Sequence, residues 1–92
     1  MIELTIFATM KQAKLDDLRR VLKSAETTKH ISKLIFDGAD SSYTFKFQGD
    51  LYEIQWDNKE MMFEMVKYID RKTFNRLGEV NGEKLAFLFY QP

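Results

Sequence analysis

One stretch of the chain decides the fold class, and it reads YTFKFQGDLYEIQW over residues 43–56. Apolar and polar side chains alternate on both sides of Gly49 and Asp50, which is the period of two expected of strands with one buried face. A two-residue turn at Gly49-Asp50 would join these strands as a β-hairpin and set their register. On one face of this hairpin the expected pairs are Phe47 with Tyr52, Phe45 with Ile54, and Tyr43 with Trp56. On the other face they are Lys46 with Glu53 and Thr44 with Gln55. These charged and polar pairs suit exposure to water.

The segment before the hairpin predicts a strand followed by a helix. Apolar residues alternate with other residues over positions 2–7, so we expect a strand there. Thr9 and Gln12 have the spacing of a capping box, and apolar residues recur at helical intervals after them. We therefore expect a helix over residues 10–26.

The segment after the hairpin predicts a second helix. Asp57 and Glu60 repeat the capping spacing. A row at helical spacing follows, formed by Met62, Met65, Val66, Ile69 and Leu77. The row predicts a helix over residues 58–77, which Gly78 would end.

The end of the chain predicts a last strand. Asn81-Gly82 suits a tight turn. The residues that follow, 85–90, are apolar on both faces, which is typical of a strand inside a sheet or against a partner.

Residues 31–36 admit two interpretations, and these lead to two versions of the fold. A strand there gives the order β-α-β-β-β-α-β, whereas an extension of the first helix gives the ferredoxin-like order β-α-β-β-α-β. We favour the strand. Both versions are a single small α+β domain over residues 1–92, with an antiparallel or mixed sheet of four to five strands and two helices on one face.

The composition predicts a small protein that folds by itself in the cytoplasm. The chain has 92 residues, 45% hydrophobic and 30% charged, a length that builds one core. It has no cysteine, which excludes disulfides and favours a reducing compartment. It shows no signal-peptide pattern and no run of about 18 apolar residues, so we expect no membrane partner. Its 14 basic and 14 acidic side chains balance, which removes the electrostatic footprint of a general nucleic-acid binder.

The residue types that carry catalysis are sparse, so we expect no enzyme, no metal site and no cofactor. His30 is the only imidazole and has no cysteine or second histidine at ligand spacing, which fits a surface histidine near a loop. The glycines are scattered and form no phosphate-binding loop. Asp37 and Asp40 share a loop, but their spacing departs from the calcium-loop pattern and favours an ordinary turn.

The expected second helix and last strand carry more apolar surface than one core contact needs. On a helical wheel Phe63 and Phe74 share one side and Tyr68 lies on the opposite flank. Such a surface suits adaptable partner contacts, although filling a small core from two directions would produce the same pattern. The candidate partner-binding residues on these two elements are Phe63, Tyr68, Phe74, Leu88 and Tyr90.

Two further surfaces are candidates. The expected first helix carries a basic strip of Arg19, Arg20 and Lys23, which could meet phosphate or an acidic protein, although a solvated helix face looks the same. The uncovered face of the sheet would present Leu51 beside polar residues. It lacks the basic-glycine-aromatic signature of RNA-recognition domains.

These observations favour a small intracellular protein-binding domain without catalysis. It would act by occupying the surface of a larger enzyme or nucleoprotein complex, as an inhibitor or accessory factor. Phages and plasmids encode many small proteins of this class. Two alternatives remain open: a nucleic-acid-binding protein that uses the basic strip, and a homodimeric regulatory domain that binds a small ligand.

Overall fold

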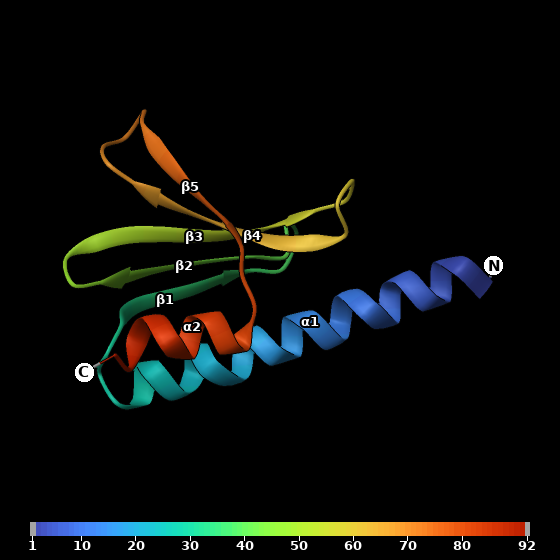
Figure 1. Ribbon diagram of the computed structural model, residues 1–92, viewed down its shortest axis with the longest axis horizontal. Coiled ribbons are helices and arrows are strands. Elements are labelled where there is room, and N and C mark those ends of the chain that lie inside the picture. Colours follow the sequence, from blue (N-terminus) through green and yellow to red (C-terminus); the bar gives the residue numbers. More distant parts are fainter. Residues whose placement is uncertain (1, 92) are drawn as a thin grey trace.

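The structure of the protein, a computed structural model, describes residues 2–91 and the side chains of residues 8–91. Its elements are α1 (Ile2–Thr27), β1 (Ser32–Asp37), β2 (Ser42–Phe47), β3 (Asp50–Asp57), β4 (Met62–Tyr68), β5 (Phe74–Glu79) and α2 (Gly82–Phe89). The strands form a five-stranded sheet in sequence order, with every neighbouring pair antiparallel. Both helices lie along the same side of this sheet (Figure 1). The α+β class is confirmed, but the order α-β-β-β-β-β-α matches neither expected order, and the ferredoxin-like arrangement is absent from the described residues.

Short turns join the strands, and three of the sheet's four turns rely on an aspartate. Oδ1 of Asp37, Asp57 or Asp70 accepts hydrogen bonds from the backbone N–H groups two and three residues further on, at 2.8–3.4 Å. An aspartate in this position reverses the chain by local hydrogen bonds alone, which favours a meander of neighbouring strands. The same bonds explain the loop with Asp37 and Asp40, which is the ordinary turn expected from the sequence.

The hairpin of β2 and β3 is confirmed, but its turn lies one residue earlier than expected. Gln48 and Gly49 have φ of 52° and 85°, the positive values of a type I′ turn. The observed pairs are Phe47 with Asp50, Lys46 with Leu51, Phe45 with Tyr52, Thr44 with Glu53, and Tyr43 with Ile54. This register differs from the expected one by two residues on β3. Because side chains alternate with a period of two, each residue still lies on the face expected for it.

Residues 2–7 belong to α1, so the expected first strand is wrong. No glycine or proline interrupts the chain between Ile2 and Thr27, and the capping pair Thr9 and Gln12 lies inside the helix. A helix satisfies its own N–H and C=O groups, whereas a strand needs a neighbour, so a segment continuous with a long helix extends it. The helix expected over residues 10–26 is confirmed. Its buried residues are Leu15, Leu18, Val21, Leu22 and Ala25.

The expected helix over residues 58–77 is also wrong, because these residues form the β3–β4 turn, β4, the β4–β5 loop and part of β5. The row that suggested a helix is divided between the two faces of the sheet. Met65 pairs with Ile54 on the face toward the helices, whereas Val66 pairs with Glu53 on the other face. Gly78 does not end a helix. It lies at a β-bulge opposite Met65 with φ of 87°, a conformation that favours glycine.

The expected last strand over residues 85–90 is replaced by α2. Asn81 begins this helix as its N-cap, with Oδ1 accepting a hydrogen bond of 2.8 Å from the N–H of Lys84, so the expected tight turn is a helix start. Leu85 and Phe89 are spaced four residues apart and are both buried. The Phe89 ring meets the Phe45 ring edge to face, 5.5 Å between centroids.

The core lies between the two helices and one face of the sheet. Its sheet residues are Tyr43, Phe45, Phe47, Tyr52, Ile54, Phe63 and Met65, and they form one cluster with the buried residues of α1 and α2. The strand interpretation of residues 31–36 is confirmed by β1, whose partner is β2. Among the described residues, no helix has the length and hydropathy needed to cross a membrane.

Candidate functional site

We call the sheet surface that turns away from the helices the open face. Cross-strand pairing places on it Ile35, Thr44, Lys46, Leu51, Glu53, Gln55, Glu64, Val66, Phe74 and Arg76. Tyr68, which pairs with Phe74, belongs to the same face. Ile35, Leu51 and Phe74 are 62%, 38% and 46% exposed, respectively. The open face therefore presents large apolar side chains to solvent from both edges and the middle of the sheet.

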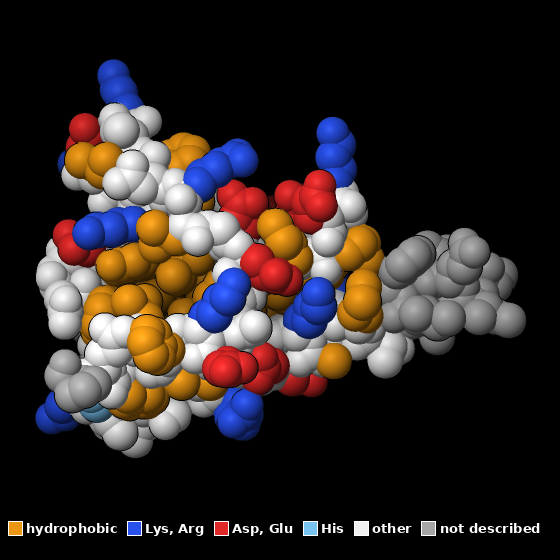
Figure 2. All heavy atoms as spheres, in the orientation of Figure 1, with side chains coloured by type: hydrophobic (Ala, Val, Ile, Leu, Met, Phe, Trp, Pro, Cys, Tyr) orange, Lys and Arg blue, Asp and Glu red, His pale blue; other side chains and the backbone are white. Residues whose placement is uncertain are grey.

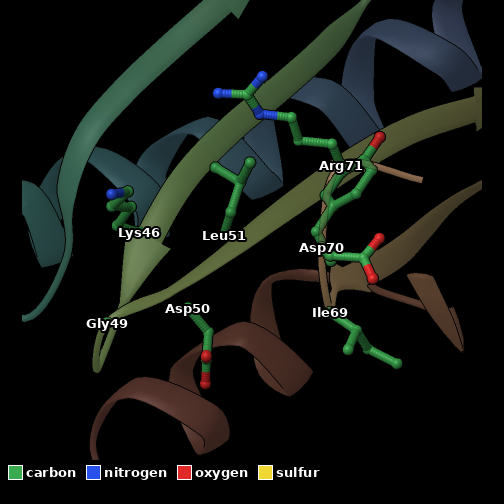
Figure 3. A pocket seen from close by; sticks show the side chains of 8 residues that line it. Lys46, Gly49, Asp50, Leu51, Ile69, Asp70 and Arg71 are labelled. Carbon is green, nitrogen blue, oxygen red and sulfur yellow. The ribbon is translucent and has the colours of Figure 1, made fainter. Parts of the chain in front are cut away.

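A hollow of about 450 Å³ lies at the end of the open face where β2 turns into β3. Its lining residues are Lys46, Gly49, Asp50, Leu51, Tyr68, Ile69, Asp70 and Arg71. They come from β2, the β2–β3 turn, β3, the end of β4 and the β4–β5 loop. Figure 3 shows Leu51 between Lys46 on one side and Arg71 on the other, with the Arg71 side chain reaching from the loop across the strands. The volume is in the range that holds a ligand group or a partner side chain.

The acidic side chains that line the hollow are already engaged. Oδ2 of Asp50 lies 3.3 Å from Nζ of Lys67, and Oδ1 of Asp70 accepts the N–H groups of Lys72 and Thr73. The hydrogen bonds from Lys72 and then Thr73 lower the pKa of Asp70 below its usual value. Both carboxylates also point away from Leu51 (Figure 3).

The basic side chains that line the hollow, Lys46 and Arg71, differ from the acidic ones in their contacts. Among the described residues, neither Lys46 nor Arg71 forms an ion pair. Their side chains likewise make no hydrogen bond within that part of the chain. The hollow therefore combines the exposed apolar side chains of Leu51 and Ile69 with two positive charges that have no ion-pair partner among the described residues.

Tyr68 is fixed in place beside the hollow. Its hydroxyl donates a hydrogen bond of 2.5 Å to Oε1 of Glu53, and its ring lies 5.9 Å from that of Phe74. The hydrogen bond to Glu53, with burial as the second cause, raises the pKa of Tyr68 above its usual value of about 10. Glu64 is similarly engaged, with Oε1 at 3.5 Å from Nε of Arg76. Glu53 of β3 and Glu64 of β4 therefore each interact with a neighbouring side chain.

The aromatic residues expected to share one helix side lie on opposite faces of the sheet. Phe63 is buried in the core and meets Trp56, with ring centroids 4.9 Å apart. The helical period of 3.6 residues places Phe63 on the same side as Phe74, whereas the alternation of side chains along strands separates the two residues. Phe74 and Tyr68 do belong together, on the open face. The structure therefore keeps two of these three residues as surface candidates and removes Phe63.

Some of the side chains of residues 85–90 form a second apolar surface, on the side of the molecule that bears the helices. Figure 2 shows hydrophobic side chains gathered over α2 and between it and the strands. Phe87 is 71% exposed and Tyr90 43%, whereas Leu88 is half-buried against the core. Tyr90 contacts the exposed His30 edge to face at 4.7 Å and donates to Oγ of Ser24 at 3.3 Å.

Each residue of the basic strip of α1 already contacts a neighbouring side chain. Arg20 lies 2.9 Å from Oδ1 of Asp17, and Nζ of Lys23 lies 3.9 Å from Oε1 of Glu26. Nε of Arg19 donates a hydrogen bond of 2.8 Å to the hydroxyl of Tyr43, and its guanidinium lies over the Phe36 ring. These three residues are on one helix, as expected, but each already has a partner.

Residues 69–71 were missed by sequence reasoning because they fall inside the expected second helix. The signal that could have found them is Asp70, which has the same role as Asp37 and Asp57 at the other turns. Leu51 and Lys46 were placed correctly on the wet face of the hairpin. Among the described residues, no group of three or more histidine, aspartate or glutamate side chains could hold a metal ion.

Comparison with known proteins gives no match: no family model, no curated protein and no solved structure is significantly similar to the chain.

Proposed function

We propose that the protein is a small non-catalytic protein-binding domain that covers part of a larger partner, as an inhibitor or accessory factor, and that the open face is its contact surface. The observation that carries this proposal is the exposure of Ile35, Leu51 and Phe74 on one face of the sheet, together with the hollow between β2 and the β4–β5 loop. Exposed apolar side chains with a polar surround are typical of a protein interface.

The width of the open face favours a macromolecular partner over a small ligand. Ile35 belongs to β1 and Phe74 to β5, at the two edges of the sheet. Four strand spacings of about 4.8 Å separate these edges, or about 19 Å. A small molecule in the hollow would leave the outlying apolar residues in water, whereas a protein surface would cover them together.

The basic strip gives less support to a nucleic-acid-binding function. Asp17 engages one guanidinium nitrogen of Arg20, and the Tyr43 hydroxyl engages one of Arg19. The Asp17 carboxylate beside Arg20 repels a phosphate group and removes part of the gain from phosphate contact.

The test compares apolar-to-aspartate variants of the two apolar surfaces. The double variant Leu51→Asp/Phe74→Asp alters the open face, and Phe87→Asp is the matched control on α2, because Phe87 is more exposed than either. Tagged proteins are used for affinity capture from the source cell, and the captured protein is then purified and titrated. We expect the control to bind like the parent and the double variant to bind at least about tenfold more weakly, as for the loss of central interface residues.

Three results would contradict the proposal. The first is that the tagged parent captures no protein in an amount close to its own. The others are loss of binding in Phe87→Asp alone, and equal binding by the parent and both variants. Light scattering on the purified parent distinguishes a second copy of the chain from a different partner. A dimer dissociated by Leu51→Asp/Phe74→Asp would show that the open face joins two copies instead.

A further inference from the structure

We infer that the hollow on the open face binds an acidic segment of the partner protein. An apolar side chain of that segment contacts Leu51, and an adjacent carboxylate lies between Lys46 and Arg71. This inference rests on the proposed function, and it adds the chemistry that the partner presents.

The first argument is the charge balance within the hollow. Two acidic and two basic side chains line it, but Asp50 is paired with Lys67 and Asp70 is held by its own turn. Lys46 and Arg71 have no such partner among the described residues. The N–H donors of Lys46 and Arg71 are therefore available to a ligand, whereas each of the two carboxylates already has a partner. Arginine also suits a carboxylate, because its guanidinium can donate two parallel hydrogen bonds.

The second argument is the position of apolar surface between the two cations. Leu51, which is 38% exposed, lies between Lys46 and Arg71 in Figure 3. Ile69 is 60% exposed and lines the same hollow. If a ligand covered this surface with a carboxylate alone, the apolar side chain of Leu51 would contact a charged group, which is unfavourable. The combination therefore fits an apolar side chain that has an acidic residue beside it.

The third argument concerns a second copy of the chain, which is the other simple occupant. On the open face Glu53 accepts the hydroxyl of Tyr68 and Glu64 is paired with Arg76. To offer Glu53 or Glu64 to Lys46 or Arg71, a second copy placed face to face would have to break one of these pairs. A different protein with an acidic segment has no such cost.

The experiment uses four synthetic hexapeptides and the isotopically labelled full chain. Glu-Glu-Leu-Phe-Glu-Glu carries both features, Gln-Gln-Leu-Phe-Gln-Gln lacks the charge, Glu-Glu-Gly-Gly-Glu-Glu lacks the apolar pair, and Lys-Lys-Leu-Phe-Lys-Lys reverses the charge. We expect the first peptide to shift the amide signals of Lys46, Leu51 and residues 69–71. The glutamine peptide should bind at least about fivefold more weakly, since each exposed charge pair contributes modestly.

Charge reversal on the protein provides the control. Lys46→Glu/Arg71→Glu should lose binding of the acidic peptide and gain binding of the lysine peptide. Lys29→Glu/Lys59→Glu changes the net charge equally at exposed lysines outside the hollow and should bind like the parent. The unfolding temperature of each variant shows that it is folded.

Equal binding of the glutamic acid and glutamine peptides, shifts that map outside the hollow, or absence of any binding would overturn the inference. The proposed function fails separately. A captured partner that is lost in Leu51→Asp/Phe74→Asp but kept in Lys46→Glu/Arg71→Glu would preserve the open-face contact and exclude the acidic segment.

Discussion

Gly82 is a position at which a residue far away in the sequence leaves no room for a side chain. Its N–H donates a hydrogen bond of 2.7 Å to Oδ2 of Asp17, which joins α1 to the first turn of α2. A Cβ atom added at Gly82 would lie 2.8 Å from Cγ of Asp17 and closer still to Oδ1. The carboxylate is also favourably placed at the positive end of the helix dipole. Space for this carboxylate therefore requires glycine at the start of α2.

We predict that Gly82→Ala lowers the free energy of unfolding by about 1–3 kcal/mol, because the carboxylate must move from the helix start. Chemical denaturation measures this change. Gly38→Ala is the control: its added Cβ would lie 3.5 Å from Cε2 of Phe36, an ordinary contact, and its stability should stay close to that of the parent. Alanine normally favours a helix over glycine, so a more stable Gly82→Ala variant would show that the Asp17 contact is absent.

Tyr68 gives a prediction that depends on pH. Its hydrogen bond to Glu53, and then burial, raises its folded-state pKa above the usual value of about 10. A raised pKa of a tyrosine means that the folded state holds the proton more tightly. The stabilisation is therefore complete below about pH 10 and is lost as the pH rises through the folded-state pKa.

We expect Tyr68→Phe to be less stable than the parent by about 1 kcal/mol at neutral pH, the net contribution of one hydrogen bond. The difference should shrink as the pH rises above about 10. Urea denaturation of both proteins over this range measures it. A constant difference, or one that grows with pH, would mean that Tyr68 does not donate to Glu53.

At the scale of elements, the turns explain both the success and the failure of sequence-based prediction. An aspartate that accepts the N–H groups two and three residues further on begins a turn in the same way as an N-cap begins a helix. Asp57 does the first and Asn81 does the second. Because the local hydrogen bonds are alike, only packing of the next residues decides whether the chain continues as a strand or a helix.

The hydrophobic pattern was informative where only one period fits. The alternation in residues 43–56 excludes a helix, and the hairpin was found there with its faces correct. The row through Met65 and Val66 fits a helix by spacing, but the same residues alternate as a strand when read with Phe63. Residues 85–90 are apolar at nearly every position, so no period stands out, and Phe87 remains exposed in the helix that they form.

The candidate site could be predicted only in part for the same reason. Leu51 and Lys46 belong to the well-defined hairpin and were placed on its wet face. Tyr68 and Phe74 were selected for a helix flank, yet they meet as a cross-strand pair. Arg71 could not be found because its position depends on where the β4–β5 turn brings it.

We predict that the Asp57 turn stabilises the sheet through its hydrogen bonds. Asp57→Ala should lower the free energy of unfolding by about 1 kcal/mol, as for the loss of a capping side chain, whereas Asp57→Asn keeps an acceptor and should lose less. Thermal or urea denaturation measures both variants. Equal losses in the two variants would mean that the Oδ1 contacts with Lys59 and Glu60 do not hold this turn.

At the scale of the whole molecule, the two helices cover one face of the sheet and leave the other in solvent. Antiparallel sheets tolerate this arrangement when the outer face is polar. Here that face carries Ile35, Leu51 and Phe74, with Lys46 and Arg71 at one end, neither of which forms an ion pair with a described residue. The net charge of the chain is zero, but the ion pairs on α1 and on the sheet include neither Lys46 nor Arg71. A net charge counted over the whole chain therefore does not reveal these two positive charges.

Methyl NMR of the labelled chain, alone and saturated with the captured partner, tests the central claim most directly. We predict shifts of the Leu51, Ile69 and Ile35 methyl groups, with the methyl signals of Leu88 on α2 unchanged. Shifts of Leu88 with those of Leu51 and Ile69 unchanged would contradict the assignment of the open face as the contact surface.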